Sequence, residues 1–198
     1  MARPMGPRFK QSRRFGVNIF GHPKELNRGV KTNRKVTEYG KQLIEKQKLK
    51  AYYGLSEKQM LRYVKDAFKE SRQGKGLIGD LAVARAEKRL DNLVYRAGFA
   101  SSLRQARQFV VHGHISLNGQ KTTIPSLEVK AGDSIGLTPR GQKLELIKEN
   151  VDASTVQVPY LQRDNESKTA VLERDPERDE VPIELTDSLV VEFYSKSI

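Results

Sequence analysis

Residues 89–137 decide the fold and read RLDNLVYRAGFASSLRQARQFVVHGHISLNGQKTTIPSLEVKAGDSIGL. Gly98 follows apolar residues at helical spacing, which places it just after the end of a first short helix. Ser102 then begins a second helix, and Gln105 stands three residues later, as in a capping box. This second helix is predicted to end at Gly113, because glycine adopts the left-handed backbone that commonly terminates helices.

After the second helix the apolar period changes from 3.6 to 2, which is typical of a strand over residues 115–117. Asn118 and Gly119 follow and predict a type I′ hairpin turn, because both tolerate a positive φ. The return strand is predicted over residues 120–124 and a further strand over residues 134–137. The stretch therefore predicts two short helices on a small antiparallel β-sheet, an α+β arrangement.

The charge of the chain is large and unevenly distributed. The net charge is +12 at pH 7, and residues 1–50 contain 14 Lys and Arg against 3 Asp and Glu. Residues 151–198 contain 5 basic and 11 acidic residues and are therefore acidic. A basic front and an acidic end favour a polyanion, such as nucleic acid, as the partner of the front. Part of the acidic end is predicted to face a basic protein, although its charge is also compatible with a solvated surface.

The composition also excludes several classes of function. The 198 residues include no cysteine, which excludes disulfides, thiolate metal sites and cysteine nucleophiles. No apolar run is long enough to span a bilayer, and the basic N-terminus lacks the apolar core of a signal peptide. The sequence therefore predicts a soluble, intracellular protein without a membrane partner.

Residues 1–36 are predicted to form an extended basic arm, because glycine and proline interrupt every helical period there. Phe9, Phe15 and Phe20 stand among its cations. These rings could stack on unpaired bases of RNA, or they could anchor the arm on the protein itself. The sequence favours neither role over the other.

A helical domain is predicted after the arm. Its helices are expected over residues 37–53, from Ser56 with Gln59 as capping-box partner, and over residues 77–88. Leu55 and Met60 occupy the positions of a hydrophobic staple at the start of the helix that Ser56 caps.

The last third of the chain gives weaker patterns. A short helix is expected over residues 143–150, and strands are expected over residues 156–161 and 170–172. Residues 189–195 read LVVEFYS, a run of branched and aromatic residues that predicts a mostly buried C-terminal strand.

The central stretch resembles the S-four RNA-binding domain. The resemblance rests on one set of residues: Ser102, Arg104, Ala106, Arg107, Val110, Gly113, Ile115, Leu117, Asn118 and Gly119. Motifs at both ends extend it, among them Met1-Ala2-Arg3, Ser12-Arg13-Arg14, Arg89-Leu90-Asp91-Asn92 and Val190-Val191-Glu192-Phe193-Tyr194. Over nearly its full length the chain is similar to the bacterial ribosomal protein S-four family, the universal uS-four family.

This resemblance implies an inserted architecture. Residues 37–88 and 182–198 would form the helical domain, with the C-terminal strand returning to it. Residues 89–181 would form the inserted S-four domain, of αL type, with a C-terminal extension.

The resemblance also implies a function. It implies a non-enzymatic, structural component of the small ribosomal subunit that binds ribosomal RNA early and nucleates assembly. The implied partners are small-subunit ribosomal RNA, ribosomal protein S-five, with which it contributes to decoding accuracy, and other small-subunit proteins. It also implies a place at the channel through which messenger RNA enters. The implied location is cytoplasmic, with an organellar ribosome as the open alternative.

The predicted RNA-binding residues come from the arm, the first helix after it and the second helix of the central stretch. Arg104 and Arg107 are expected to project as a donor pair for phosphates, with Leu103 on the buried side. In the arm, Lys31, Arg34 and Lys35 match the segment that faces messenger RNA in the family. The full set is Arg3, Arg8, Lys10, Arg13, Arg14, Lys31, Arg34, Lys35, Lys46, Lys48, Arg104, Arg107, Gln108, His112 and His114.

Two departures from the family affect these expectations. Many relatives carry zinc-binding cysteines in the arm, and this chain has none, so no metal and no cofactor are predicted. Residues 27–30 read NRGV where many relatives have another motif, which leaves the path of the arm on RNA open.

Two rival functions compete with the ribosomal one. Pseudouridine synthases often carry an S-four domain and a catalytic aspartate in an Arg-Leu-Asp motif, which occurs here at Arg89-Leu90-Asp91. That motif lies in a helical pattern, so Asp91 is interpreted as a carboxylate at a helix N-terminus. The second rival is a stand-alone, chaperone-like binder of dissociated subunits, which would need neither the long arm nor the C-terminal segment.

Overall fold

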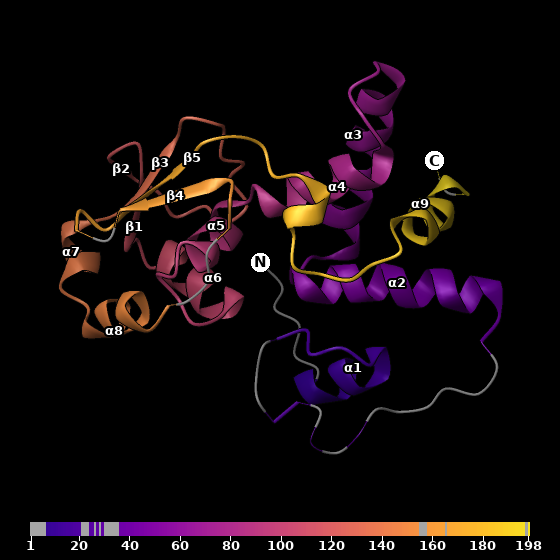
Figure 1. The fold of residues 1–198 in the computed structure, drawn as a ribbon, viewed down its shortest axis with the longest axis horizontal. Helices are drawn as coiled ribbons and strands as arrows, with labels where there is room; N and C mark the ends of the chain where they lie inside the picture. The colour runs from indigo at the N-terminus through magenta and orange to yellow at the C-terminus, as the bar shows by residue number, and fades with distance from the viewer. Residues whose placement is uncertain are drawn as a thin grey trace. The chain divides into compact units, whose positions relative to one another are not determined.

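The computed structural model divides the chain into two compact units (Figure 1). Unit 1 comprises Met1–Ala82 and Ile183–Ile198, and unit 2 comprises Val83–Pro182. The sequence places this boundary at residue 88, whereas the division falls inside a helix. The structure describes residues 7–20, 24, 25, 27, 29, 36–154, 158–164, 166–196 and 198, without the side chain of Arg8.

Unit 1 is helical. Its C-terminal helix α9 packs against α2 and α3, although these helices lie far apart in the sequence. Helix α1 contacts α2, and α4 leads from unit 1 into unit 2. The helices are α1 (Arg8–Phe15), α2 (Glu38–Tyr52), α3 (Glu57–Arg72), α4 (Ile78–Glu87) and α9 (Asp187–Ser195).

Local capping fixes where α2 and α3 begin. The backbone N–H of Gly40 donates to the side chain of Thr37, the N-cap of α2. Ser56 accepts a hydrogen bond from the Gln59 N–H at 3.3 Å, and the Gln59 side chain accepts one from the Ser56 N–H at 3.2 Å. The predicted capping box is therefore confirmed, and it satisfies two backbone donors that the helix leaves free.

Helix α1 lies where the sequence predicts extended backbone. Pro7 precedes it in an extended conformation and Gly16 follows it in the left-handed region, with φ at 71°. Proline and glycine thus bracket this helix instead of interrupting it. Ser12 is fully buried, so part of the arm packs on protein.

The predicted C-terminal strand is wrong, because residues 187–195 form helix α9. Val190 and Tyr194, four residues apart, are both buried, as expected for one face of a helix. Branched and aromatic residues favour strands only weakly, and packing against α2 and α3 outweighs that preference here.

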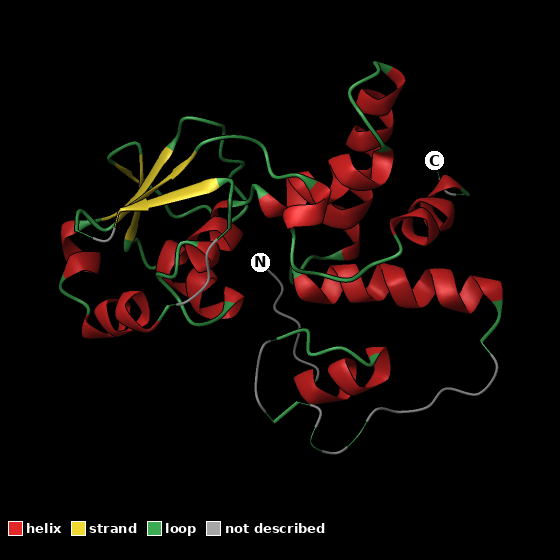
Figure 2. Cartoon of the chain, viewed as in Figure 1, coloured by secondary structure: helices red, strands yellow, loops and turns green. Residues whose placement is uncertain are grey.

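Unit 2 is a five-stranded antiparallel sheet with helices packed against it (Figure 2). The strand order is β2-β1-β3-β5-β4. The predicted α+β class, with a small antiparallel sheet, is confirmed. The elements are α5 (Leu90–Arg96), α6 (Leu103–Val111), β1 (Ile115–Leu117), β2 (Gln120–Lys121), β3 (Ser134–Leu137), α7 (Pro139–Gln142), α8 (Glu145–Ala153), β4 (Leu161–Asp164), β5 (Thr169–Leu172) and the 3₁₀ turn η1 (Arg178–Glu180).

The core of unit 2 lies between the sheet and α5, α6 and α8. Ile135 at the centre of the sheet is opposite Leu117 on one neighbouring strand and Ala170 on the other. Phe109 of α6 and Ile147 of α8 belong to the same buried cluster. This packing holds α6 against the sheet and leaves its other side exposed.

The β1–β2 hairpin forms as predicted. Asn118 and Gly119 have φ values of 51° and 77°, the two positive values that a type I′ turn requires. The Asn118 side chain also donates to Asp133 at 2.8 Å and accepts from the Ser134 N–H at 2.8 Å, which ties the turn to β3. Strand β2 spans only Gln120–Lys121 and is shorter than predicted.

Three further details differ from the sequence predictions. Gln105 accepts from the N–H of Ser101 at 2.6 Å and not from that of Ser102, so only half of the predicted capping box forms. The helix predicted over residues 143–150 is α8, which spans Glu145–Ala153. The strand predicted over residues 156–161 is β4, which begins only at Leu161.

Candidate nucleic-acid interface

Helix α6 presents one polar face to solvent. Ala106, Phe109 and Val110 are buried in the core of unit 2. Arg104, Gln108 and His112 are exposed and, being four residues apart, they lie in one row along the helix. Leu103 is only half-buried, because it lies at the edge of the apolar face in the first turn. Its predicted place in the core is therefore corrected.

Both ends of α6 are fixed. The Ser102 side chain accepts from the Gln105 N–H, and Gly113 after the C-cap has φ at 73°. The row of Arg104, Gln108 and His112 is therefore presented on a rigid element. Such preorganisation favours binding, because few side-chain and backbone rotations have to be lost.

Arg107 belongs to a buried ion-pair network, which the sequence did not reveal. Asp91, 0% exposed, accepts from the Arg89 Nε and Nη2 at 3.0 and 2.8 Å. Arg107 donates to the same carboxylate from its Nε and Nη2, each at 2.8 Å, while its side chain remains 20% exposed. Asp91 thus lies at the N-terminus of α5, as interpreted, and also connects α5 to α6.

A second buried network joins the end of α4 to α5. Glu87 accepts from the Arg96 Nε at 2.6 Å and from the Tyr160 hydroxyl at 2.6 Å. All three side chains are buried. This network therefore connects the end of α4, α5 and the segment before β4 inside unit 2.

His112 and His114 flank Gly113 at the end of α6, with ring centroids 6.2 Å apart. His112 is exposed and His114 is buried. Burial lowers the pKa of His114, and the positive charges of Arg140, His112 and Lys121 lower it further. Lys121 and Arg140 are exposed cations that the sequence analysis missed, because only the fold brings β2 and α7 next to His114.

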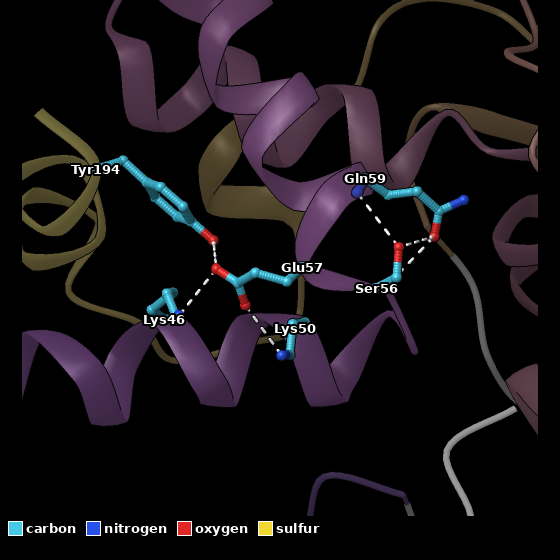
Figure 3. A network of polar contacts seen from close by, with 6 residues as sticks. All are labelled: Lys46, Lys50, Ser56, Glu57, Gln59 and Tyr194. Carbon is cyan, nitrogen blue, oxygen red and sulfur yellow. Dashed lines mark hydrogen bonds and ion pairs between the residues drawn. The ribbon is translucent and has the colours of Figure 1, made fainter. Parts of the chain in front are cut away.

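Lys46 is engaged within the protein (Figure 3). It is 6% exposed, and its Nζ lies 2.8 Å from Glu57 and 4.3 Å from the centre of the Phe193 ring. The Tyr194 hydroxyl donates to the same carboxylate at 2.8 Å, and Lys50 lies 3.0 Å from its other oxygen. Lys46 therefore contributes to the attachment of α9.

Lys48 is also buried, and its Nζ lies 3.6 Å from Glu45. Among the predicted arm residues, Lys10 and Arg14 are exposed on α1 and Arg13 is half-buried. Arg3, Lys31, Arg34 and Lys35 lie outside the described residues, as does the side chain of Arg8.

Glu57→Gln is expected to reduce stability at neutral pH and to have little effect at pH 2. Burial opposes the charged form of Glu57, but hydrogen bonds from Lys46, Lys50 and Tyr194 outweigh it and lower its pKa from 4.5 to about 2. The stabilisation is therefore present above pH 4.5 and is lost as the pH falls toward 2. We expect a loss of about 1 kcal/mol at pH 7, since the site is half-exposed.

Denaturant unfolding of parent and variant between pH 7 and pH 2 measures this effect. The exposed pair of Glu38 with Lys41 supplies the control, and Glu38→Gln should change the free energy of unfolding by less than about 0.5 kcal/mol. A constant difference between parent and Glu57→Gln across this pH range would contradict the assignment.

The described residues contain neither a membrane-spanning helix nor a cluster of metal-ligating side chains. No helix among them is long and apolar enough to cross a membrane. Within the same residues, no group of three His, Asp or Glu side chains is arranged to hold a metal ion.

Comparison with known proteins matches both units. The family model described as "Ribosomal protein S4/S9 N-terminal domain" matches residues 3–83, and the one described as "S4 domain" matches residues 88–135. The chain is 51% identical over 197 residues to "Small ribosomal subunit protein uS4B" of Clostridium acetobutylicum, covering 100% of both chains.

Two further relatives give the same result. "Small ribosomal subunit protein uS4" of Finegoldia magna is 52% identical over 202 residues, covering 99% of this chain and 100% of the relative. The protein of the same name from Halalkalibacterium halodurans is 42% identical over 204 residues, with the same coverage. The similarity therefore extends through the helical unit, the sheet and the C-terminal segment.

Proposed function

Because the chain belongs to the uS4 family of small ribosomal subunit proteins, we propose that it is a structural component of this subunit and binds its ribosomal RNA through the S-four domain. The observation that carries the proposal is the exposed row of Arg104, Gln108 and His112 on a helix fixed inside the matched domain. The family is structural and not enzymatic, which confirms the prediction that the chain is not an enzyme.

Binding would proceed through the RNA backbone. The guanidinium of Arg104 suits phosphate oxygens, and Gln108 and His112 can donate to phosphate or ribose. Because the fold fixes the direction of α6, recognition depends on whether phosphates of a folded RNA match the spacing of the row. Arg107 supports this face, since its salt bridge with Asp91 holds α6 on α5.

The finer roles are part of the same proposal. The chain would bind ribosomal RNA early and nucleate assembly, act with ribosomal protein S-five in decoding accuracy, and lie near the channel through which messenger RNA enters. The similarity over the full length supports these roles.

The excess of acidic residues in 151–198 supports a basic protein as neighbour of this segment. In assembled small subunits, we expect carboxylate-directed cross-linkers to join residues 173–180 mainly to lysines of another protein. Contacts mainly with RNA would contradict this neighbour.

Arg104→Ala combined with Gln108→Ala is expected to weaken binding to small-subunit ribosomal RNA by at least about tenfold, because each hydrogen bond to a charged group contributes about 1.5–3 kcal/mol. The thermal unfolding temperature should stay near that of the parent, since both side chains are exposed. Filter binding beside a thermal melt gives both quantities.

Lys130→Ala is the matched control, because it removes an exposed cation from another part of unit 2. It should reduce affinity no more than about twofold. If the double variant binds like this control, the α6 row is not the RNA-binding face.

Co-sedimentation with small subunits through a salt wash tests the proposal against the chaperone-like alternative. A stable component stays bound, whereas a transient binder of dissociated subunits is removed. An assay for uridine modification in ribosomal RNA addresses the enzymatic alternative, and we expect no product.

A further inference from the structure

We propose that His114, Lys121 and Arg140, together with His112, form a second site for a backbone phosphate of RNA, beside the C-terminal end of α6. The inference rests on the proposed RNA-binding function and adds to it a site built by β2 and α7. Neither the family matches nor the row on α6 assigns any role to Lys121 or Arg140.

Three elements converge on this site. A Cβ atom at Gly113 would lie 2.4 Å from Cε and 3.0 Å from Nζ of Lys121, so the lysine side chain of β2 crosses the end of α6. A Cβ atom at Gly141 would lie 2.3 Å from the carbonyl oxygen of His114, so the backbone of α7 lies directly against this residue. A side chain at position 113 would therefore displace Lys121, and one at position 141 would displace the backbone of His114.

Hydrogen bonds fix this convergence. The backbone N–H of Thr138 donates to the carbonyl oxygen of His114 at 3.0 Å. The Thr138 hydroxyl donates to the carbonyl oxygen of Gly113 at 3.0 Å and accepts from the Gly141 N–H at 3.2 Å. Arg140 therefore projects from a helix whose first turn is tied to the segment that carries both histidines.

His114 has an unused polar atom at the centre of the cluster. Its side chain lies edge-on to Phe109, with centroids 6.0 Å apart, and the residue is 7% exposed. Its Nδ1 is buried and has no hydrogen-bond partner among the described residues. Buried polar groups in proteins are usually paired, and a protonated Nδ1 at this position can donate to an anion that the neighbouring cations attract.

The electrostatics agree with this geometry. The charged groups that act on His114 are Arg140 from α7, His112 from the end of α6 and Lys121 from β2. Among the described residues, no carboxylate is found with the charges that act on His114. A phosphate would offset the repulsion among these positive groups. Guanidinium and ammonium groups bind phosphate through charge-assisted hydrogen bonds.

The site has a consequence for protonation. Burial and the three neighbouring positive groups keep the pKa of His114 below its usual value. A bound phosphate would oppose those charges and raise this pKa, so binding takes up a proton. Affinity for RNA should therefore rise as the pH falls from about 8 to about 6, which follows from linkage.

The first experiment removes charges from the site and measures the affinity of the full chain for small-subunit ribosomal RNA. Lys121→Gln with Arg140→Gln is compared with Lys130→Gln with Lys143→Gln, two exposed lysines of unit 2 that do not act on His114. We expect the first pair to weaken binding roughly tenfold and to flatten the slope of log affinity against log salt by about 1.4–1.8. We expect the control pair to change affinity no more than about twofold.

The second experiment measures how RNA affinity depends on pH, which reports the uptake of a proton by His114. From pH 8 to pH 6, the parent should gain more affinity than His114→Gln, by at most about threefold for each half unit by which the bound phosphate raises the pKa of His114. His112→Gln measures the contribution of the other histidine of the site, and the gain in affinity that this variant retains is the part due to His114. Circular dichroism of each variant verifies the fold.

The outcomes separate this inference from the proposed function. If the parent binds small-subunit ribosomal RNA no better than unrelated RNA, the proposed function fails. If the parent binds selectively but the Lys121 and Arg140 variant matches its control, the second phosphate site is wrong and the function stands. Equal pH responses of parent and His114→Gln would also overturn the site.

Discussion

Asp91→Asn is expected to lower the free energy of unfolding by about 3–5 kcal/mol, since it leaves two guanidinium groups without their charged partner. Asp91 is fully buried, and its carboxylate accepts from both Arg89 and Arg107. Arg89, 1% exposed, cannot reach solvent without moving α5. Asparagine has nearly the same volume as aspartate. The loss of stability would therefore come from the lost charge pairing and not from a cavity.

Chemical denaturation monitored by circular dichroism measures this effect. Asp152→Asn is the control, because Asp152 is exposed in the last turn of α8 and should change stability by less than about 0.5 kcal/mol. If Asp91→Asn is no less stable than this control, the network does not hold α5 and α6 together. Arg107→Ala should destabilise as well, so weaker RNA binding by that variant alone would not identify Arg107 as an RNA ligand.

Affinity for small-subunit ribosomal RNA is expected to fall about a thousandfold between about 50 and 200 mM monovalent salt, if about six phosphates are neutralised. The motivation is the net charge of +12 and its concentration in residues 1–50. Each phosphate contact releases condensed counterions, so log affinity falls linearly with log salt.

The measurement is a filter-binding series at constant magnesium and pH. Affinity at a fixed salt concentration cannot replace it, because the slope and not the single value counts the phosphate contacts. A slope equivalent to two contacts or fewer would contradict binding through the basic surface and would favour base stacking or protein contacts.

Elements defined by neighbouring residues could be predicted from the sequence. The capping box of Ser56 and Gln59, and the turn at Asn118 and Gly119, each depend on side chains within three residues of the backbone they stabilise. Helix α9 could not be identified in this way, because its residues favour strands when taken alone. Only the surfaces of α2 and α3, about 140 residues earlier in the chain, select the helical period.

The predicted RNA-binding residues also fall into two groups: those that the local sequence identifies and those whose role depends on contacts between helices. The exposed face of α6 follows from its 3.6-residue period, but the engagement of Arg107 by Asp91 and of Lys46 by Glu57 joins different helices. One signal was available: Asp91 stands among Leu90, Leu93 and Val94, and a carboxylate in an apolar segment requires a buried cation. Lys121 and Arg140 carried no comparable signal.

The two-segment construction of unit 1 makes the folding of this unit depend on the last helix. All residues of unit 2 are contiguous and have their own hydrophobic core, so this unit can fold without residues 183–198. Glu57 of unit 1, in contrast, accepts from Tyr194 of the last helix. In a chain truncated after residue 186, we expect fast hydrogen exchange in α2 and α3 beside a protected sheet. Equal protection in both units would contradict this dependence.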